Sequence, residues 1–161
     1  MDELETVFLR IIEEQKKIIY KVCLVYAKDE ETIGDLYQEV ALNIWKALPG
    51  FRGASKTSTW VYRIALNTCV SWLRSSRKQP RTVPFTLSLG DIFEDEHDKD
   101  DLREIYRLIG RLGELDRAVI LLWLDGKSYK EIAETLGVSP SVVGVRINRI
   151  KAKLREMSNN N

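Results

Sequence analysis

The stretch SYKEIAETLGVSPSVVGVRINRIKAKLR, residues 128–155, decides the fold of the C-terminal part of the chain. It opens with a short helical pattern whose inner face is apolar: Ile132, Ala133 and Leu136. Gly137 follows at the end of that pattern, where only glycine adopts a left-handed backbone cheaply. Ser139 is a favourable N-cap and Pro140 a favourable first residue for a second helix. Two helices joined by this short turn predict a helix-turn-helix.

The second helix, from Ser139 to Arg155, separates an apolar face from a basic one. Its inner positions recur at intervals of four, three and four residues: Val143, Ile147, Ile150 and Leu154. The segment holds five basic residues and no acid. A DNA major groove accepts such a helix, whose first residues can reach bases and whose later cations can reach phosphates. The alternative is an ordinary helical hairpin with a solvated basic face, which the absence of acids disfavours.

Helical spacing of apolar residues continues through most of the chain and predicts an all-α protein. We expect further helices near residues 4–28, 33–48, 58–77, 102–112 and 119–124. Thr57 or Ser58 is the expected N-cap of the third of these.

Residues 80–101 combine prolines and a glycine with the acidic run DIFEDEHDKDD, a composition typical of a linker. The sequence therefore predicts two small helical domains, residues 1–79 and 102–157, joined by a flexible linker at 80–101. Residues 158–161 are expected to form a disordered tail.

The overall composition excludes several classes of protein. The net charge of +1 is the sum of unlike parts: +2 for residues 1–79, −5 for 80–101 and +4 for 102–161. Two cysteines without paired spacing and one histidine argue against a metal site, and no cofactor is expected. The N-terminal segment is interrupted by acids, and no apolar run approaches the roughly 20 residues of a membrane helix. We expect a cytoplasmic protein.

A long stretch from Val40 to Gly90 contains no acidic residue. It holds eight cations: Lys46, Arg52, Lys56, Arg63, Arg74, Arg77, Lys78 and Arg81. Aromatic residues lie among them: Trp45, Phe51, Trp60, Tyr62 and Trp72. Cations beside aromatic rings are typical of surfaces that hold single-stranded nucleic acid, and the loop at 51–57 could hold an extruded base. The alternative is that the rings are core residues of a helix bundle, which we favour for Trp45 and leave open for Trp60 and Tyr62.

Two stretches together resemble a known family. DLYQEVALNIWKALPGFRGASKTSTWVYRIALNTCVSWLRSSRK, residues 35–78, resembles region 2 of bacterial RNA polymerase sigma factors. LGELDRAVILLWLDGKSYKEIAETLGVSPSVVGVRINRIKAKLRE, residues 112–156, resembles region 4 of the same proteins. The order and spacing are similar to those of the small extracytoplasmic-function (ECF) group of the sigma-70 family. The resemblance implies a non-enzymatic factor that binds core RNA polymerase, directs it to specific promoters and promotes DNA melting.

The resemblance also implies a role for individual residues. Four would dock the clamp helices of the polymerase's largest subunit: Asp35, Gln38, Glu39 and Asn43. Ten would capture and melt the minus-ten element: Phe51, Arg52, Lys56, Ser58, Trp60, Tyr62, Arg63, Asn67, Arg74 and Arg77. Six would contact the minus-thirty-five element: Ser141, Arg146, Asn148, Arg149, Lys151 and Lys153. Further implied partners are the polymerase flap, promoter DNA and a membrane-associated anti-sigma factor, with no direct membrane contact by the chain itself.

The chain departs from the family pattern at a few positions. Gly144 stands where many members have a cation, Val142 where many have threonine, and Ser71 where many have aspartate. These departures put promoter specificity in doubt.

Three rival classes fit less well. A one-component or response regulator needs a phosphoacceptor or ligand pocket, which the helical, basic and aromatic first half does not offer. A nucleic-acid enzyme needs clustered carboxylates, which the acid-free stretch removes from the contact surface. A plain single-strand binder does not need the helix-turn-helix.

Overall fold

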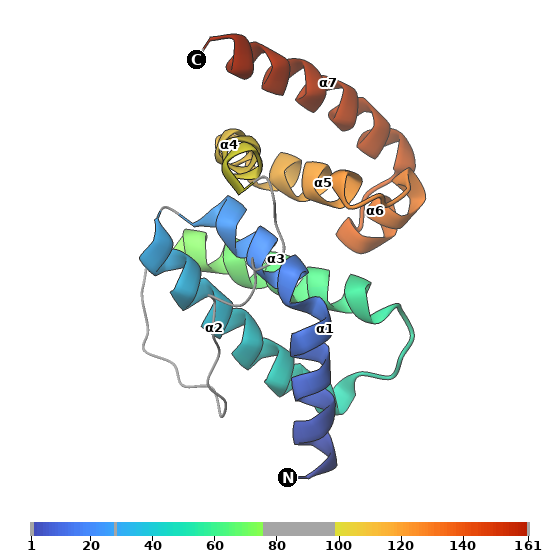
Figure 1. Ribbon diagram of the computed structural model, residues 1–161. Coiled ribbons are helices and arrows are strands. Elements are labelled where there is room, and N and C mark those ends of the chain that lie inside the picture. Colours follow the sequence, from blue (N-terminus) through green and yellow to red (C-terminus); the bar gives the residue numbers. More distant parts are fainter. Residues whose placement is uncertain (1, 28, 76–98, 161) are drawn as a thin grey trace. The chain divides into compact units, whose positions relative to one another are not determined.

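The computed structural model describes residues 2–27, 29–75 and 99–160. Its chain divides into two compact units, Met1–Glu96 and His97–Asn161 (Figure 1). All regular structure in the described ranges is helical, which confirms the prediction of an all-α fold. Most of the expected linker and the expected site residue Arg77 lie outside the described residues.

The first unit is built from three long helices, α1 (Glu3–Tyr26), α2 (Glu30–Ala47) and α3 (Thr57–Ser75), with a short 3-10 turn, η1 (Leu48–Gly50), after α2. Each long helix packs against the other two, as Figure 1 shows. Their inner faces supply fully buried side chains: Phe8, Ile19, Tyr26, Leu36, Ile44 and Tyr62. Since each large apolar side chain stabilises the fold by about 1.5–3 kcal/mol on burial, this shared core orients the three helices.

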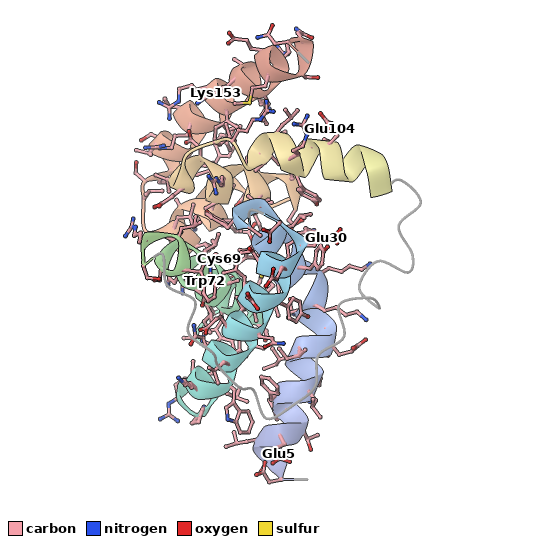
Figure 2. The ribbon with its side chains drawn as sticks, turned by 90° about the vertical axis from the view of Figure 1, so that its left-hand side faces the viewer. Glu5, Glu30, Cys69, Trp72, Glu104 and Lys153 are labelled. Carbon is pink, nitrogen blue, oxygen red and sulfur yellow. The ribbon has the colours of Figure 1, made fainter. Side chains whose placement is uncertain are left out.

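Acidic side chains begin the first two helices. The Asp2 carboxylate accepts a hydrogen bond from the Glu5 amide at 2.8 Å. The Asp29 carboxylate accepts from both the amide and the hydroxyl of Thr32, at 2.8 and 2.7 Å. Asp29 therefore starts α2 at Glu30 (Figure 2), three residues before the expected position, and its acidic first turn is favourable with the helix dipole.

The start of α3 differs from the prediction. The Trp60 amide donates to the Lys56 carbonyl at 3.0 Å, and the helix begins at Thr57. Thr57 and Ser58 thus lie inside the first turn, and the prediction that one of them is the N-cap is wrong.

The second unit contains α4 (Lys99–Ile109), α5 (Glu114–Leu124), α6 (Tyr129–Leu136) and α7 (Pro140–Asn159). α7 packs against the other three helices, and α5 packs against α6. The predicted inner face of α7 is confirmed at Val143, Ile147 and Ile150, which are buried.

The predicted turn between α6 and α7 is confirmed in its caps. Before the turn, Ser128 and Glu131 form a reciprocal capping box at the start of α6, which we did not predict from the sequence. Gly137 ends α6 at φ 72°, and its amide donates to the Ala133 carbonyl at 2.8 Å. The Ser139 hydroxyl accepts from the Val142 amide at 3.3 Å and starts α7. These local bonds fix the angle at which α7 leaves α6.

Three boundaries of the second unit extend beyond the expected ones. α5 begins at Glu114 rather than near residue 119. α4 begins at Lys99 rather than near residue 102. α7 continues through Asn159, and the Asn160 amide donates to the Glu156 carbonyl at 3.2 Å. Ser158 and Asn159 are therefore helical, contrary to the expected disordered tail, because neither proline nor glycine interrupts the helix after Leu154.

Candidate functional site

α3 presents one exposed stripe to solvent. We define the α3 stripe as four of the expected minus-ten residues: Trp60, Arg63, Asn67 and Arg74. At 100° per residue these positions fall within an arc of roughly 60° on the helix. The last three are exposed and Trp60 is half-buried, whereas the opposite face of α3 lies in the core. The structure therefore brings these four residues together on one surface.

A loop joins this stripe at its N-terminal end. The Phe51 ring stacks on the Trp60 ring, with centroids 4.3 Å apart and an interplanar angle of 19°. Gly53 has a φ of +71° with open space around it, and Arg52 and Lys56 are exposed. The aromatic stack holds residues 51–56 against the first turn of α3, so two further cations lie beside the stripe.

Tyr62 does not belong to this surface. Its side chain is 0% exposed, although Trp60 stands only two residues earlier on the same helix. Positions two apart on a helix are separated by roughly 200°, so only one of the two rings can face the core. The prediction that Tyr62 contacts the minus-ten element is wrong, and the core interpretation holds instead.

Other aromatic rings pack within the first unit. Trp45 meets the buried Phe8 ring edge to face at 5.3 Å, which supports the core interpretation of Trp45. Ser58 is half-buried in the first turn of α3, and Trp72 is half-buried near Cys69 in the last turns (Figure 2).

The four residues expected to dock polymerase lie on one side of α2. Gln38 is exposed, whereas Asp35, Glu39 and Asn43 are half-buried. The Asn43 amide donates to the Thr68 hydroxyl at 2.8 Å, and that hydroxyl donates to the Ile64 carbonyl at 2.6 Å. Asn43 therefore also connects α2 to α3, a role that the sequence did not reveal.

The outer side of α7 forms a second exposed surface. We define the α7 face as five exposed residues in its first half: Ser141, Val142, Val145, Asn148 and Arg149. Val145 is the centre of this arc and is 68% exposed. Lys153 is exposed further along the helix (Figure 2). The α7 face thus mixes polar, basic and apolar side chains.

Two cations expected to contact the minus-thirty-five element are held by α5. The Arg146 guanidinium donates to Asp116 at 2.7 Å and lies at the edge of the α7 face. The Lys151 ammonium lies 4.0 Å from the centroid of the Trp123 ring, outside the arc of the α7 face. The structure therefore groups Ser141, Asn148 and Arg149 and places Arg146 and Lys151 beside them.

The opposite edge of the α7 face is formed by α6. A Cβ atom on Gly144 would lie 3.3 Å from the Tyr129 ring, which is itself 42% exposed. Tyr129 thus covers the backbone of α7 where no side chain projects. We did not predict Tyr129 as a site residue. Gly144, in the middle of the predicted helix, was the signal in the sequence that could have indicated a close neighbour.

Three further features bear on what the chain can bind. Among the residues that the structure describes, no group of three or more His, Cys, Asp or Glu gathers as metal ligands. No helix within the described ranges has the length and apolarity needed to cross a membrane. Cys23 and Cys69 are fully buried, and burial raises the pKa of the Cys23 thiol, with a smaller contribution from Cys69.

Two family models match the chain. The model described as Sigma-70 region 2 matches residues 11–79, which include the α3 stripe. The model described as Sigma-70, region 4 matches residues 102–154, which include the α7 face.

Several RNA polymerase sigma factors are similar to this chain in sequence. The ECF RNA polymerase sigma factor SigG of Mycobacterium tuberculosis is 33% identical over 150 residues, which cover 75% of this chain and 40% of SigG. The RNA polymerase sigma factor SigZ of Bacillus subtilis is 34% identical over 131 residues, covering 80% of this chain and 74% of SigZ. The ECF RNA polymerase sigma-E factor of Escherichia coli is 32% identical over 133 residues, covering 74% and 70%. The chain therefore spans less than half the length of SigG but most of the other two.

Solved structures share the fold. CnrH in complex with the cytosolic domain of CnrY has a TM-score of 0.70 at 22% identity, covering 98% of this chain and 90% of that one. The sigma factor RpoE from Bartonella quintana, in complex with the anti-sigma factor NepR, has a TM-score of 0.69 at 18% identity, covering 99% and 98%. At these identities the likeness shows the fold alone.

Proposed function

Because the chain belongs to the ECF group of the sigma-70 family of RNA polymerase sigma factors, we propose that it binds core RNA polymerase and directs it to specific promoters. The observation that carries this proposal is the pair of exposed surfaces. Each helical unit presents one exposed face that carries cations: the α3 stripe in the first holds Arg63 and Arg74, and the α7 face in the second holds Arg149, with further cations beside it. A protein that must hold two separate promoter elements needs two such faces.

The first unit would open and hold the minus-ten element. Arg63 and Arg74 would track the phosphates of one strand, and Asn67 between them would donate or accept hydrogen bonds at base edges. Trp60 would stack on an unpaired base, and the loop that Phe51 anchors would receive an extruded one. Arg52, Lys56 and Ser58 would assist from the loop and the first turn, and the resemblance adds Arg77.

The second unit would place α7 in the major groove of the minus-thirty-five element. Ser141, Asn148 and Arg149 would face the bases from the first half of the helix. Lys153 would contact a phosphate further along it. Arg146 and Lys151 would contribute charge from the edges of the groove while keeping their contacts with α5.

Polymerase would dock on the acidic side of α2 through Asp35, Gln38 and Glu39, with Asn43 at its rim. The clamp helices would meet this side, and the flap would meet the second unit. CnrH and RpoE were each solved with a protein partner, which supports an anti-sigma factor as the regulator of this chain too. The factor would act in the cytoplasm by binding alone, with the polymerase supplying all catalysis.

A transcription assay tests the proposal. Core polymerase from the same organism, free of other sigma factors, is incubated with the chain and a library of its genomic fragments. We expect run-off transcripts that start from a small set of fragments sharing two conserved elements. The absence of any transcript above the level of core polymerase alone would contradict the proposal. Stable DNA binding without polymerase binding would favour a transcriptional regulator instead.

A further inference from the structure

The helix-turn-helix exposes several large apolar side chains, although contact with water alone does not favour them there. Six large apolar side chains are exposed among the residues whose side chains the structure describes. Three of them lie here: Tyr129, Val142 and Val145. Single exposed apolar residues are ordinary on protein surfaces, but three on one short motif call for an explanation.

Helix stability does not explain the two valines. Branched side chains at Cβ make weaker helices than alanine does. The packing of α7 on the core uses Val143, Ile147 and Ile150 instead, all of which are buried. Val145 lies on the opposite side of the helix from these residues, with 68% of its surface exposed.

The surroundings of Val145 indicate what it could contact. Ser141 and Arg149 lie on the same arc and can form hydrogen bonds, whereas Val145 between them cannot. The Tyr129 ring limits the arc on one side, at Gly144, and the pair formed by Arg146 and Asp116 limits it on the other. A partner in this position must therefore present an apolar group among hydrogen-bonding groups.

On the edges of base pairs in the major groove, the 5-methyl group of thymine is the apolar group among donors and acceptors. We propose that Val142 and Val145 recognise thymine in the upstream promoter element, each through contact with a 5-methyl group. The inference rests on the proposed placement of α7 in the major groove. It assigns these positions a preference for A·T pairs that involves no hydrogen bond.

Replacing thymine by deoxyuridine tests the contact, because it removes the methyl group and keeps every hydrogen-bonding group. Holoenzyme, assembled from core polymerase and the full chain, first selects duplexes from a library randomised over the upstream element. Each upstream thymine of the selected duplex is then replaced in turn, and affinity is measured by competition. For the wild-type chain we expect a loss of about fourfold at one or two positions, the effect of one methyl group removed from water.

Variants link that loss to individual side chains. Val145→Ala should bind the thymine and deoxyuridine duplexes equally at one upstream position. Val142→Ala should do the same at another. Both residues are exposed and alanine is the better helix former, so both variants should fold. Leu124→Ala removes a large apolar side chain that is 49% exposed at the end of α5 and should keep the full preference for thymine.

Three results would overturn the inference while leaving the proposed function intact. They are a selected upstream element without thymine, equal binding of both duplexes by the wild type, and an unchanged preference in both valine variants. If holoenzyme selects no upstream sequence at all, the proposed function fails together with the inference.

Discussion

The Arg146 guanidinium donates to the Asp116 carboxylate at 2.7 Å across thirty positions of sequence. Asp116 lies in the first turn of α5, and its side chain is only 14% exposed. The same oxygen lies 3.5 Å from a guanidinium nitrogen of Arg149. One carboxylate of α5 therefore positions two cations of the helix that would enter the major groove.

Asp116→Ala should destabilise the second unit. A charge-assisted hydrogen bond contributes about 1.5–3 kcal/mol when well shielded, and Arg146 is 31% exposed, so we expect a loss of about 1–2 kcal/mol. Urea unfolding followed at amide signals of α7 measures it. A double-mutant cycle with Arg146→Ala isolates the coupling between the two side chains.

The matched control is Lys153→Ala, which removes an exposed cation from the same helix and should change the free energy of unfolding by less than about 0.5 kcal/mol. A coupling energy near zero in the cycle would contradict the predicted stabilisation by this pair.

Gly144→Ala should stabilise α7. Alanine in place of glycine within a helix gains about 1 kcal/mol of unfolding free energy. Opposing this gain, the new Cβ would meet the Tyr129 ring at 3.3 Å, so the ring must shift by a few tenths of an ångström. Because Tyr129 is 42% exposed and the contact is with the far part of its side chain, that shift is cheap. We expect a net gain of about 0.5–1 kcal/mol in urea unfolding.

The background Tyr129→Ala separates the two contributions to this change. Without the ring, Gly144→Ala should show the whole propensity gain. A variant that destabilises the chain only when Tyr129 is present would mean that the ring cannot move, contrary to our expectation.

Much of the fold could be predicted from local signals in the sequence, because hydrogen bonds between residues close in sequence determine where the helices begin and end. The caps at Gly137 and Ser139 each use partners within four residues, so they could be recognised from spacing alone. The pair formed by Asp116 and Arg146 could not, since only the packing of α5 against α7 brings the two residues together.

The candidate site was harder to predict than the helices. Trp60 and Tyr62 have similar chemistry and lie in one acid-free stretch, so composition could not say which ring is buried. The register of α3 determines which ring is buried. It directs Tyr62 into the core and leaves the Trp60 ring stacked on the Phe51 ring. In the same way the family resemblance selected Asn43, whereas its bond to Thr68 appears only when α2 meets α3.

Asn43→Ala should reduce the stability of the first unit by about 1 kcal/mol, because it removes the hydrogen bond to Thr68. Asp35→Ala should weaken binding of core polymerase more than Asn43→Ala does. Urea unfolding and titration with labelled core polymerase measure the two effects separately. Gln38→Ala, exposed on the same helix, serves as the control for stability and should not change it. Unchanged stability in Asn43→Ala would contradict the structural role.

Trp60→Leu should impair promoter opening more than duplex binding. Leucine keeps apolar bulk but removes the aromatic face that would stack on an unpaired base, an interaction of about 1–3 kcal/mol. We expect about a tenfold loss of permanganate-reactive thymines on a duplex promoter, and a smaller defect on a template that is already open. Trp72→Leu, on the same helix but off the α3 stripe, should open the promoter normally. Equal loss of opening and duplex binding would contradict the role in melting.

Alkaline pH should destabilise the first unit through two buried groups. Burial raises the pKa of Cys23 above its ordinary value of 9.0, and burial also raises the pKa of Tyr37 above 10.0. Both groups stay protonated in the folded chain and ionise in the unfolded chain, so stability is complete below the unfolded pKa and falls as pH rises above it. The thiol acts first, above pH 9, and each group adds a slope of up to about 1.4 kcal/mol per pH unit. Urea unfolding between pH 7 and 10.5 measures the fall, which Cys23→Ala should reduce between pH 9 and 10. A free energy of unfolding that stays level across this range would mean that neither group ionises on unfolding.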